Sequence, residues 1–586
     1  AGVSMRDGGS HLVLASLLTA LLLPCCGGLA TQPGASAATA PAATSPSFAP
    51  APATMPSRGM SLKEQLDMEE ELAKYMGGQA ASSSKTPPPV AAIIMPGTPD
   101  ASETANLNRS NQSLAYDPWS SDAVGVGDKC LGRFQAPPVP EHSTDLNGVA
   151  LAPVCFADKW KAHVFVVGDW GGVAKYPGEL PVPADHRSRH FPSLHRPFVI
   201  GADDCAQLKV ARQMSKRAVE SQPDYVLNMG DNFYWGGIEA KCGGAPSMCS
   251  DATGQWSRIF EEIYEGPGLD GKQWLGVLGN HDFGGFKFTN GWDQAIGYTW
   301  VDAAPSTGRW MTPALYWSVK VHYADFAVDY FFVDSNVFDA FEENANQHHN
   351  ICSKLHNPRS GATCGVRGPI STEECPSWFK RLWDAEMQWL ERGLALSRAH
   401  WQVVVTHFPP EHGQEDWRRL SIDYGIDLIV TGHRHQQEVH YLVGNFLAPT
   451  AYVVAGGGGG ITSESTPAAD GTDDQYGFMD LTITRSEIMI EAISHGGQIR
   501  STTCINPRQA APGAKERVIA AMGGALPAAP IPAPAEAVGP SLCNGRPAGP
   551  QPLPTSAEDA GPAADTGAVP ATPGAAPADP GATLAN

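Results

Sequence analysis

The sequence predicts an α/β layered fold, and three observations lead to that prediction. Short runs rich in Val, Leu and Ile recur five times between residues 163 and 430, as strands buried on both faces do. Helical patterns lie between them, at 206–221 and 384–398. Each run ends in a polar cluster, and in α/β folds the functional loops gather at the carboxyl ends of neighbouring strands. We therefore expect the five clusters to converge on one site.

The five runs and their clusters follow one another in a fixed order. They are "HVFVV" with "GDWGG" (168–172), "DYVLNM" with "GDNFY" (230–234), "WLGVL" with "GNHD" (279–282), "WQVVV" with "THFPPEHG" (406–413) and "DLIV" with "TGHRH" (431–435). A glycine run at 456–460 follows "AYVVA" and predicts a loop whose backbone comes close to a neighbouring group. Residues 236–256 and 340–376 are interpreted as surface elaborations. No repeat of 20–50 residues is visible, which argues against solenoids and propellers.

Composition divides the rest of the chain. Residues 1–30 carry Arg6, the apolar run "HLVLASLLTALLL" (11–23) and then small residues, which predicts a signal peptide rather than a membrane span. Residues 31–113 form a low-complexity linker with a short helical pattern at 61–78. Residues 114–506 hold every tryptophan and predict one large domain. The Ala/Pro/Gly-rich segment 507–586 is predicted to be a disordered tail.

Cysteine usage fits an oxidising compartment. Ten of the twelve cysteines remain after the predicted signal peptide, and an even number there predicts disulfides. We expect Cys242 to pair with Cys249 and to close a short surface loop. Sequons at Asn108 and Asn111 predict glycosylation. The predicted location is the secretory pathway, with a secreted, extracellular or vacuolar protein; the alternative is an organelle reached through a bipartite signal that includes residues 31–60.

The net charge restricts the partners. A formal charge of −21 speaks against non-specific binding to nucleic acid or to an anionic membrane, and we expect no stable membrane insertion. It does not speak against a phosphorylated substrate, because a metal pair can make one pocket locally positive. Phosphorylated small molecules or phosphoproteins are the expected partners. The sequence does not choose between a monomer and a homodimer.

The clusters together contain a metal-ligand inventory. Taken singly, a strand-end Asp is more often a helix cap or turn former, and an isolated His is more often a surface or core residue. Oxygen and imidazole ligands without thiolates favour Fe, Zn or Mn. Their number exceeds the needs of one ion, so we expect two ions with a bridging carboxylate, a centre suited to hydrolytic phosphoryl transfer. The candidates are Asp169, Asp231, Asn280, His281, His407, His433 and His435.

The five ordered motifs carry a resemblance to a known family. "GDWG", "GDNFY", "GNHD", the strand-end His of "VVVTHF" and "GHRH" resemble the purple acid phosphatases of the metallophosphoesterase (calcineurin-like) superfamily. "GDNFY" and "EHG" (411–413) are closest in style to the small tartrate-resistant acid phosphatases. The resemblance covers about residues 160–500. It implies a four-layer α-β-β-α sandwich with a dinuclear metal site at the strand ends, and it makes 114–506 the catalytic domain.

The resemblance also implies a role for each site residue. It gives Fe(III) to Asp169, Tyr234 and His435, and gives a second divalent ion (Fe, Zn or Mn) to Asn280, His407 and His433, with Asp231 as the bridge. His281 would bind phosphate or protonate the leaving group, oriented by Asp282. His412 would be a second substrate-facing imidazole; the alternative is a surface turn residue.

The implied function is a dinuclear metal-dependent acid phosphatase, a phosphoric monoester hydrolase that works by in-line attack of metal-bound hydroxide. One alternative is another metallophosphoesterase, such as a phosphodiesterase or a phosphoprotein phosphatase. Tyr234 argues against it, because those relatives generally lack a phenolate at that position. Another is a non-catalytic secreted binding protein on the same fold. Taken alone, Tyr234 would be interpreted as a packed aromatic residue.

Overall fold

The computed structural model describes the central part of the chain. The described residues are 130–172, 196–249, 251, 254–345, 349–357, 361–365, 367–521 and 541–544. The predicted signal peptide, the linker with its helical pattern at 61–78 and the sequons at Asn108 and Asn111 lie outside them. No described helix combines the length and the apolar character that a membrane crossing requires.

Two sheets form the middle of the fold. The eight-stranded sheet has the order β1-β7-β8-β9-β10-β12-β11, with β2 also paired to β7, and the seven-stranded sheet has the order β15-β14-β13-β3-β4-β5-β6. The strands are β1 Val149–Ala150, β2 Val154–Phe156, β3 Ala162–Val167, β4 Tyr225–Asn228, β5 Trp274–Gly276, β6 Trp310–Met311, β7 Trp317–Tyr323, β8 Ala327–Phe332, β9 Trp401–Val405, β10 Leu428–Thr431, β11 Gln437–His440, β12 Ala451–Ala455, β13 Gly477–Ile483, β14 Ile488–Ser494 and β15 Ile499–Ile505.

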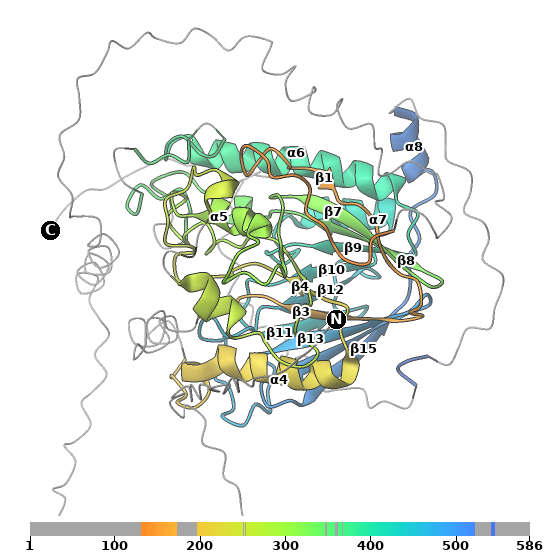
Figure 1. The fold of residues 1–586 in the computed structure, drawn as a ribbon. Helices are drawn as coiled ribbons and strands as arrows, with labels where there is room; N and C mark the ends of the chain where they lie inside the picture. The colour runs from red at the N-terminus through yellow and green to blue at the C-terminus, as the bar shows by residue number, and fades with distance from the viewer. Residues whose placement is uncertain are drawn as a thin grey trace, which may run out of the picture. The chain divides into compact units, whose positions relative to one another are not determined.

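Helices cover the outer faces of both sheets. In Figure 1, α6 lies along one side of the pair of sheets and α4 along the other. The helices are α4 Ala206–Ser221, α5 Trp292–Gly297, α6 Cys375–Leu396, α7 Gln414–Tyr424 and α8 Ala514–Ala521.

Three separate hydrophobic clusters confirm the layered arrangement. In β3, Val164 and Val166 face the eight-stranded sheet, whereas Phe165 and Val167 belong to the cluster under α4. This alternation follows from the two-residue period of a strand, and it explains why the strand is apolar throughout. The third cluster packs α6 and α7 against the outer face of the eight-stranded sheet. The order is therefore helix, sheet, sheet, helix, and the predicted four-layer α-β-β-α sandwich is confirmed.

The predicted strands and helices are present with small shifts. All five apolar runs contain strands, namely β3, β4, β5, β9 and β10, and α4 has the predicted bounds. The helix predicted at 384–398 begins earlier, at Cys375, because Pro376 occupies its first turn, where a missing N–H costs nothing. Within the segment predicted to be a disordered tail, residues 514–521 instead form α8, which packs against α6 and α7 and buries Ala514 and Ile519.

The predicted Cys242–Cys249 disulfide is wrong. Cys242 pairs with Cys364, 122 residues away, and this bond joins the two surface elaborations. Cys249 carries no disulfide; its thiol donates to the carbonyl of Gln294 at 3.2 Å. Sequence proximity favoured the short loop, but the fold brings the 361–365 segment next to Cys242. The other bonds join Cys130 to Cys155, Cys352 to Cys375 and Cys504 to Cys543.

Candidate metal centre

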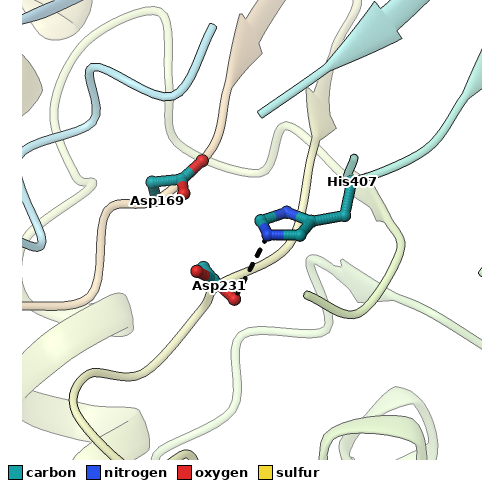
Figure 2. Close-up of side chains that lie close together, drawn as sticks. All are labelled: Asp169, Asp231 and His407. Carbon is teal, nitrogen blue, oxygen red and sulfur yellow. Dashed lines mark ion pairs between the residues drawn. The ribbon is translucent and has the colours of Figure 1, made fainter. Parts of the chain in front are cut away.

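The five strand ends meet where the two sheets face each other. β3, β4 and β5 are parallel neighbours in one sheet, and β9 and β10 are parallel neighbours in the other. Ligand atoms of Asp169, Asp231 and His407 lie within 4.8 Å of one another, and all three residues are buried. Figure 2 shows them pointing toward a common centre from three separate strand ends. The expected convergence of the clusters is therefore present in the structure.

Tyr234 and His435 complete one half of this cluster. The Tyr234 hydroxyl lies 2.7 Å from Asp231 Oδ2 and 3.1 Å from Asp169 Oδ1. His435 Nε2 lies 3.4 Å from the same hydroxyl and 3.6 Å from Asp169 Oδ1. The three residues to which the resemblance gives the ferric ion therefore lie together, with Asp231 next to them.

Asn280 and His433 lie in the other half, around His407. His407 Nε2 is 3.1 Å from Asn280 Oδ1 and 3.5 Å from Asp231 Oδ1. The His433 ring lies edge-on to the His407 ring, with 5.3 Å between the ring centroids. Asp231 thus contacts groups in both halves, the place expected of a bridging residue.

The atoms of His407, Asn280 and Asp231 that face one another are hydrogen-bond acceptors. His407 Nδ1 lies 2.8 Å from the carbonyl of Met229, so the ring proton is on Nδ1 and Nε2 presents a lone pair. That lone pair faces the Asn280 and Asp231 oxygens described above. Acceptors held this close repel one another unless a cation lies among them. These atoms therefore fit the role of metal ligands. Their mixture of oxygen and imidazole nitrogen is suited to Fe, Zn or Mn.

The backbone at these positions adopts an uncommon conformation. Asp169, Asp231 and His433 have positive φ angles of 58°, 52° and 68°. Non-glycine residues rarely occupy the left-handed region, and such residues concentrate at functional sites. The carboxylates are also fixed by amides, because His433 N donates to Asp169 Oδ2 at 3.0 Å and His281 N donates to Asp231 Oδ1 at 2.8 Å.

Two glycines leave the room that the carboxylates occupy. A Cβ at Gly279 would lie 2.2 Å from Asp231 Oδ1, and a Cβ at Gly432 would lie 2.4 Å from Asp169 Oδ2. Real Cβ atoms do not approach other atoms so closely. A glycine at each of these positions therefore lets the backbone approach the carboxylates.

Burial and neighbouring charges shift the pKa values of the residues in the cluster. It raises the pKa of Asp169 well above its ordinary value, and the neighbouring Asp231 raises it further. Burial also opposes the ionised form of Asp231, but the nearby His407 and His281 together with hydrogen bonds hold the pKa of Asp231 below its ordinary value. The pKa of His407 is lowered by burial, and that of His433 is lowered further by burial and neighbouring imidazoles. The lowered pKa values favour the neutral form of both rings, which is the form that binds metals.

Tyr234 depends most strongly on a cation. Burial and the adjacent Asp169 and Asp231 raise the pKa of its phenol well above the usual value. A phenolate beside two carboxylates requires a nearby positive charge, because like charges disfavour its ionised form. A trivalent ion would supply that charge.

His281 lies beside the cluster, but its predicted orientation by Asp282 is wrong. His281 Nδ1 instead lies 2.6 Å from the carbonyl of Trp235. The Asp282 carboxylate faces the backbone, where it accepts from the amides of Gly279 at 2.8 Å and Asn232 at 3.0 Å. The His281 ring packs 4.6 Å from the Tyr234 ring, centroid to centroid.

His412 lies near the cluster rather than on a remote turn. Its ring centroid is 5.8 Å from that of His433 and 5.1 Å from that of Phe408. Burial lowers the pKa of His412. The main chain at His412 is also fixed, since its carbonyl accepts from Trp417 Nε1 at 3.0 Å. His412 itself lies in a turn and is partly exposed, so its substrate-facing role stays a prediction beside the alternative of a surface turn residue.

Several groups that support the site were not predicted. Asp339 contacts Asn280, and Glu464 contacts His435. Asp339 follows a sixth apolar run, "DYFFVDSNVFD", and β8 in that run is a neighbour of β9, so the same strand-end rule could have found it. Glu464 follows the glycine run with no strand-end signal. The carbonyls of Met229 and Trp235 are invisible to any analysis of side-chain types.

Comparisons with known proteins agree with this geometry. The family model for calcineurin-like phosphoesterases matches residues 162–437. Purple acid phosphatase 17 of Arabidopsis thaliana is 28% identical over 239 residues, 39% of this chain and 57% of that protein. Human tartrate-resistant acid phosphatase type 5 is 22% identical over 305 residues, 48% of this chain and 73% of that protein. The matched segment thus spans little more than half of the plant relative.

Among solved structures, GAP50, described as the anchor in the inner membrane complex of Plasmodium, aligns with a TM-score of 0.39 and 16% identity. The alignment covers 60% of this chain and 90% of that one.

The matched segment contains all five strand ends that build the cluster, and the relatives that share it are purple and tartrate-resistant acid phosphatases. The chain therefore carries a calcineurin-like phosphoesterase domain, and this domain is similar to purple and tartrate-resistant acid phosphatases.

Proposed function

We propose that the protein is a dinuclear metal-dependent acid phosphatase that hydrolyses phosphate monoesters. One observation carries the proposal: the buried acceptors of Asp231, Asn280 and His407 converge without a proton to share, and Asp169, Tyr234 and His435 adjoin them. Bound cations would stabilise such an arrangement of acceptors. Two cations explain it.

The proposed metal assignment follows the two halves of the cluster. Asp169, Tyr234 and His435 would hold Fe(III), while Asn280, His407 and His433 would hold a divalent Fe, Zn or Mn ion. Asp231 would bridge them, which its contacts with both halves support. A metal pair supplies an activated water near neutral or acidic pH and neutralises charge on a phosphoryl group.

His281 and His412 are proposed to act on the substrate. Because His281 Nδ1 donates to the Trp235 carbonyl, Nε2 is the nitrogen that would meet the phosphate or protonate the departing alcohol. The main-chain contact fixes the ring plane, so this proton would be delivered from a set position. His412, beside His433, would face the substrate from the other half of the cluster.

Tyr234 favours this proposal over the other metallophosphoesterase activities. A phosphodiesterase or a phosphoprotein phosphatase does not need a phenol in contact with both carboxylates of the cluster. A non-catalytic binding protein would not need the neutral imidazoles, the left-handed backbone and the close-approach glycines together.

The proposed setting is the secretory pathway. Four disulfides among the described residues support an oxidising compartment. Phosphorylated small molecules or phosphoproteins are the proposed substrates. The net charge of −21 argues against nucleic acid as a partner.

The proposal is tested on the full chain, produced through an oxidising pathway so that its disulfides form. Metal content, the visible spectrum, and hydrolysis of p-nitrophenyl phosphate and bis(p-nitrophenyl) phosphate are measured against pH. We expect two ions per chain, a purple to violet colour, an acidic optimum and preference for the monoester. A colourless protein with alkaline activity, or one that prefers the diester, would contradict the assignment.

A further inference from the structure

Two carboxylates outside the predicted ligand set each touch one predicted ligand. Asp339, the last residue of the short helix η5 (Asn336–Asp339), places Oδ2 3.1 Å from Asn280 Nδ2. Glu464, in the loop after β12, places Oε1 3.1 Å from His435 Nδ1. Asn280 and His435 lie in opposite halves of the cluster, so each half has one such contact.

The Asp339 contact fixes the orientation of an amide. Asn280 has an oxygen end and an NH₂ end, and the Asp339 oxygen Oδ2 accepts from the NH₂ end. The NH₂ group therefore faces Asp339, and Oδ1 is turned toward His407 Nε2, 3.1 Å away. A reversed amide would present N–H groups to a bound cation and repel it.

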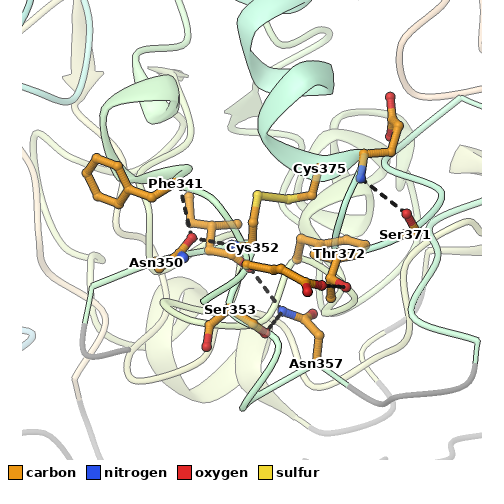
Figure 3. Close-up of a disulfide and its surroundings, with 12 residues drawn as sticks. Phe341, Asn350, Cys352, Ser353, Asn357, Ser371, Thr372 and Cys375 are labelled. Carbon is orange, nitrogen blue, oxygen red and sulfur yellow. Dashed lines mark hydrogen bonds between the residues drawn. A yellow bond between two sulfur atoms is a disulfide. The ribbon is translucent and has the colours of Figure 1, made fainter. Parts of the chain in front are cut away.

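Asp339 is itself held from the far side. It is buried, with 4% of its surface exposed, and its carbonyl accepts from the amide of Ile351 at 2.8 Å. Ile351 precedes Cys352, whose disulfide with Cys375 joins this segment to the start of α6 (Figure 3). Asn350 Oδ1 accepts from the amides of Phe341 and Cys352 at 3.1 and 2.9 Å. Hydrogen bonds within the insertion that begins at residue 340 thus fix the position of Asp339.

The Glu464 contact fixes the tautomer of an imidazole. With its proton on Nδ1 directed to Glu464, His435 presents the Nε2 lone pair to Asp169 Oδ1 at 3.6 Å. Two further bonds join these residues: His435 N donates to the Glu464 carboxylate at Oε1, 3.1 Å away, and Glu464 N donates to the His435 carbonyl at 3.3 Å. A carboxylate behind a metal-binding imidazole orients the ring and raises its basicity.

We propose that Asp339 and Glu464 are positioning residues, one for each half of the metal site: Asp339 holds Asn280 for the divalent ion, and Glu464 holds His435 for the ferric ion. The inference rests on the proposed function for the identity of the two ions. Loss of such a partner typically weakens metal affinity by about 10- to 100-fold. Each substitution should therefore weaken its own half more than the other.

The test uses the full chain with its metals bound. Asp339→Asn, Asp339→Leu, Glu464→Gln and Glu464→Leu are compared with wild type in metal content per chain during stepwise dialysis against a chelator, in the visible band and in melting temperature. Asp427→Asn and Asp473→Asn are the matched controls, because these carboxylates accept from backbone amides and contact none of the predicted ligands.

We expect the Asp339 variants to lose the divalent ion at about 10- to 100-fold lower chelator concentration while the visible band persists. The Glu464 variants should lose or shift the band. Amide variants retain one acceptor oxygen, so they should fall between wild type and the leucine variants. The controls should retain metal as wild type does.

Equal loss of both ions in every variant, or wild-type metal retention with only a lower melting temperature, would overturn the positioning role. If a leucine variant does not fold, its amide counterpart decides the outcome. A wild-type protein that binds no pair of ions would contradict the proposed function, whereas a two-metal wild type with unaffected variants would contradict only the positioning role.

Discussion

Buried carboxylates have different neighbours at the two ends of the same strands. β4 begins after Asp224 and leads to Asp231, while β10 begins after Asp427 and leads to His433. At the amino ends each carboxylate meets donors: Asp224 accepts from Tyr323 and contacts Lys159, and Asp427 accepts from the amides of Gln402 and Arg508.

At the carboxyl ends acceptors lie beside the carboxylates together with donors. Asp231 is as deeply buried as Asp427, but part of its surroundings is the unprotonated Nε2 of His407 and the oxygen of Asn280. Burial alone therefore does not mark the functional carboxylates of this protein. What distinguishes them is that the fold gathers acceptors around them and leaves the compensating positive charge to come from outside.

The largest expected effect comes from replacing an aspartate by asparagine at the carboxyl end of β4, with the same replacement at its amino end as the control. Asp231→Asn should lose both metals and lower phosphatase activity by more than about 100-fold, the upper range for groups that only support a ligand. Asp224→Asn, the matched control, should keep both metals and should change only the free energy of unfolding. Metal analysis and p-nitrophenyl phosphate hydrolysis of the two variants measure metal retention and activity. Normal turnover in Asp231→Asn would break the comparison.

Tyr234 sharpens the comparison because its side chain donates to both Asp169 and Asp231. Tyr234→Phe should remove the visible band while the divalent ion stays bound. In the metal-free protein the free energy of unfolding should fall by about 1.5–3 kcal/mol, since the phenol donates to a carboxylate. Absorption spectra and denaturant unfolding check the two effects. Persistence of the band would exclude the phenolate as its source.

The strand ends explain why much of the site could be predicted from the sequence. Asp169, Asp231, Asn280, His407 and His433 each follow an apolar run, and parallel neighbours in a sheet bring such positions together. The layered fold could be predicted for the same reason, because doubly buried strands such as β9 read as continuous apolar runs.

What could not be predicted depends on contacts across long separations. Cys364 reaches Cys242 because the insertion folds back, and nothing in the local sequence around Cys249 reveals this. His281 is oriented by a main-chain carbonyl, and Glu464 reaches His435 from a loop without periodicity. Side-chain type and spacing carry no information on such contacts.

Two cysteines of the loop that follows β4 differ in their bonding: Cys242 forms a disulfide with Cys364, whereas Cys249 forms none. Substitutions at these cysteines test the difference. Removing the Cys242–Cys364 bond with the double substitution Cys242→Ser and Cys364→Ser should cost about 2–5 kcal/mol of stability. Cys249→Ser should change it by less than about 0.5 kcal/mol, because that thiol closes no loop. Thermal unfolding and peptide mapping of the non-reduced protein measure the result. A Cys242–Cys249 peptide would contradict the observed pairing.

The last expected effect lies at the amino end of β10. Burial raises the pKa of Asp427 to about 7, above the value of about 3.9 for an unfolded chain. A carboxyl with a raised folded-state pKa stabilises the fold most fully below the unfolded pKa, and this contribution is lost as the pH rises toward 7. Asp427→Asn removes the titration, so the stability of the variant should fall less between pH 4 and 7, by on the order of 1 kcal/mol per pH unit.

Melting temperatures of wild type and Asp427→Asn across this pH range measure the difference, with metal content as the control. Parallel curves would show that Asp427 does not titrate in that range. A variant with a flatter curve and unchanged metal content would separate the two kinds of buried carboxylate: those that meet donors govern how stability depends on pH, and those that meet acceptors govern the binding of metal.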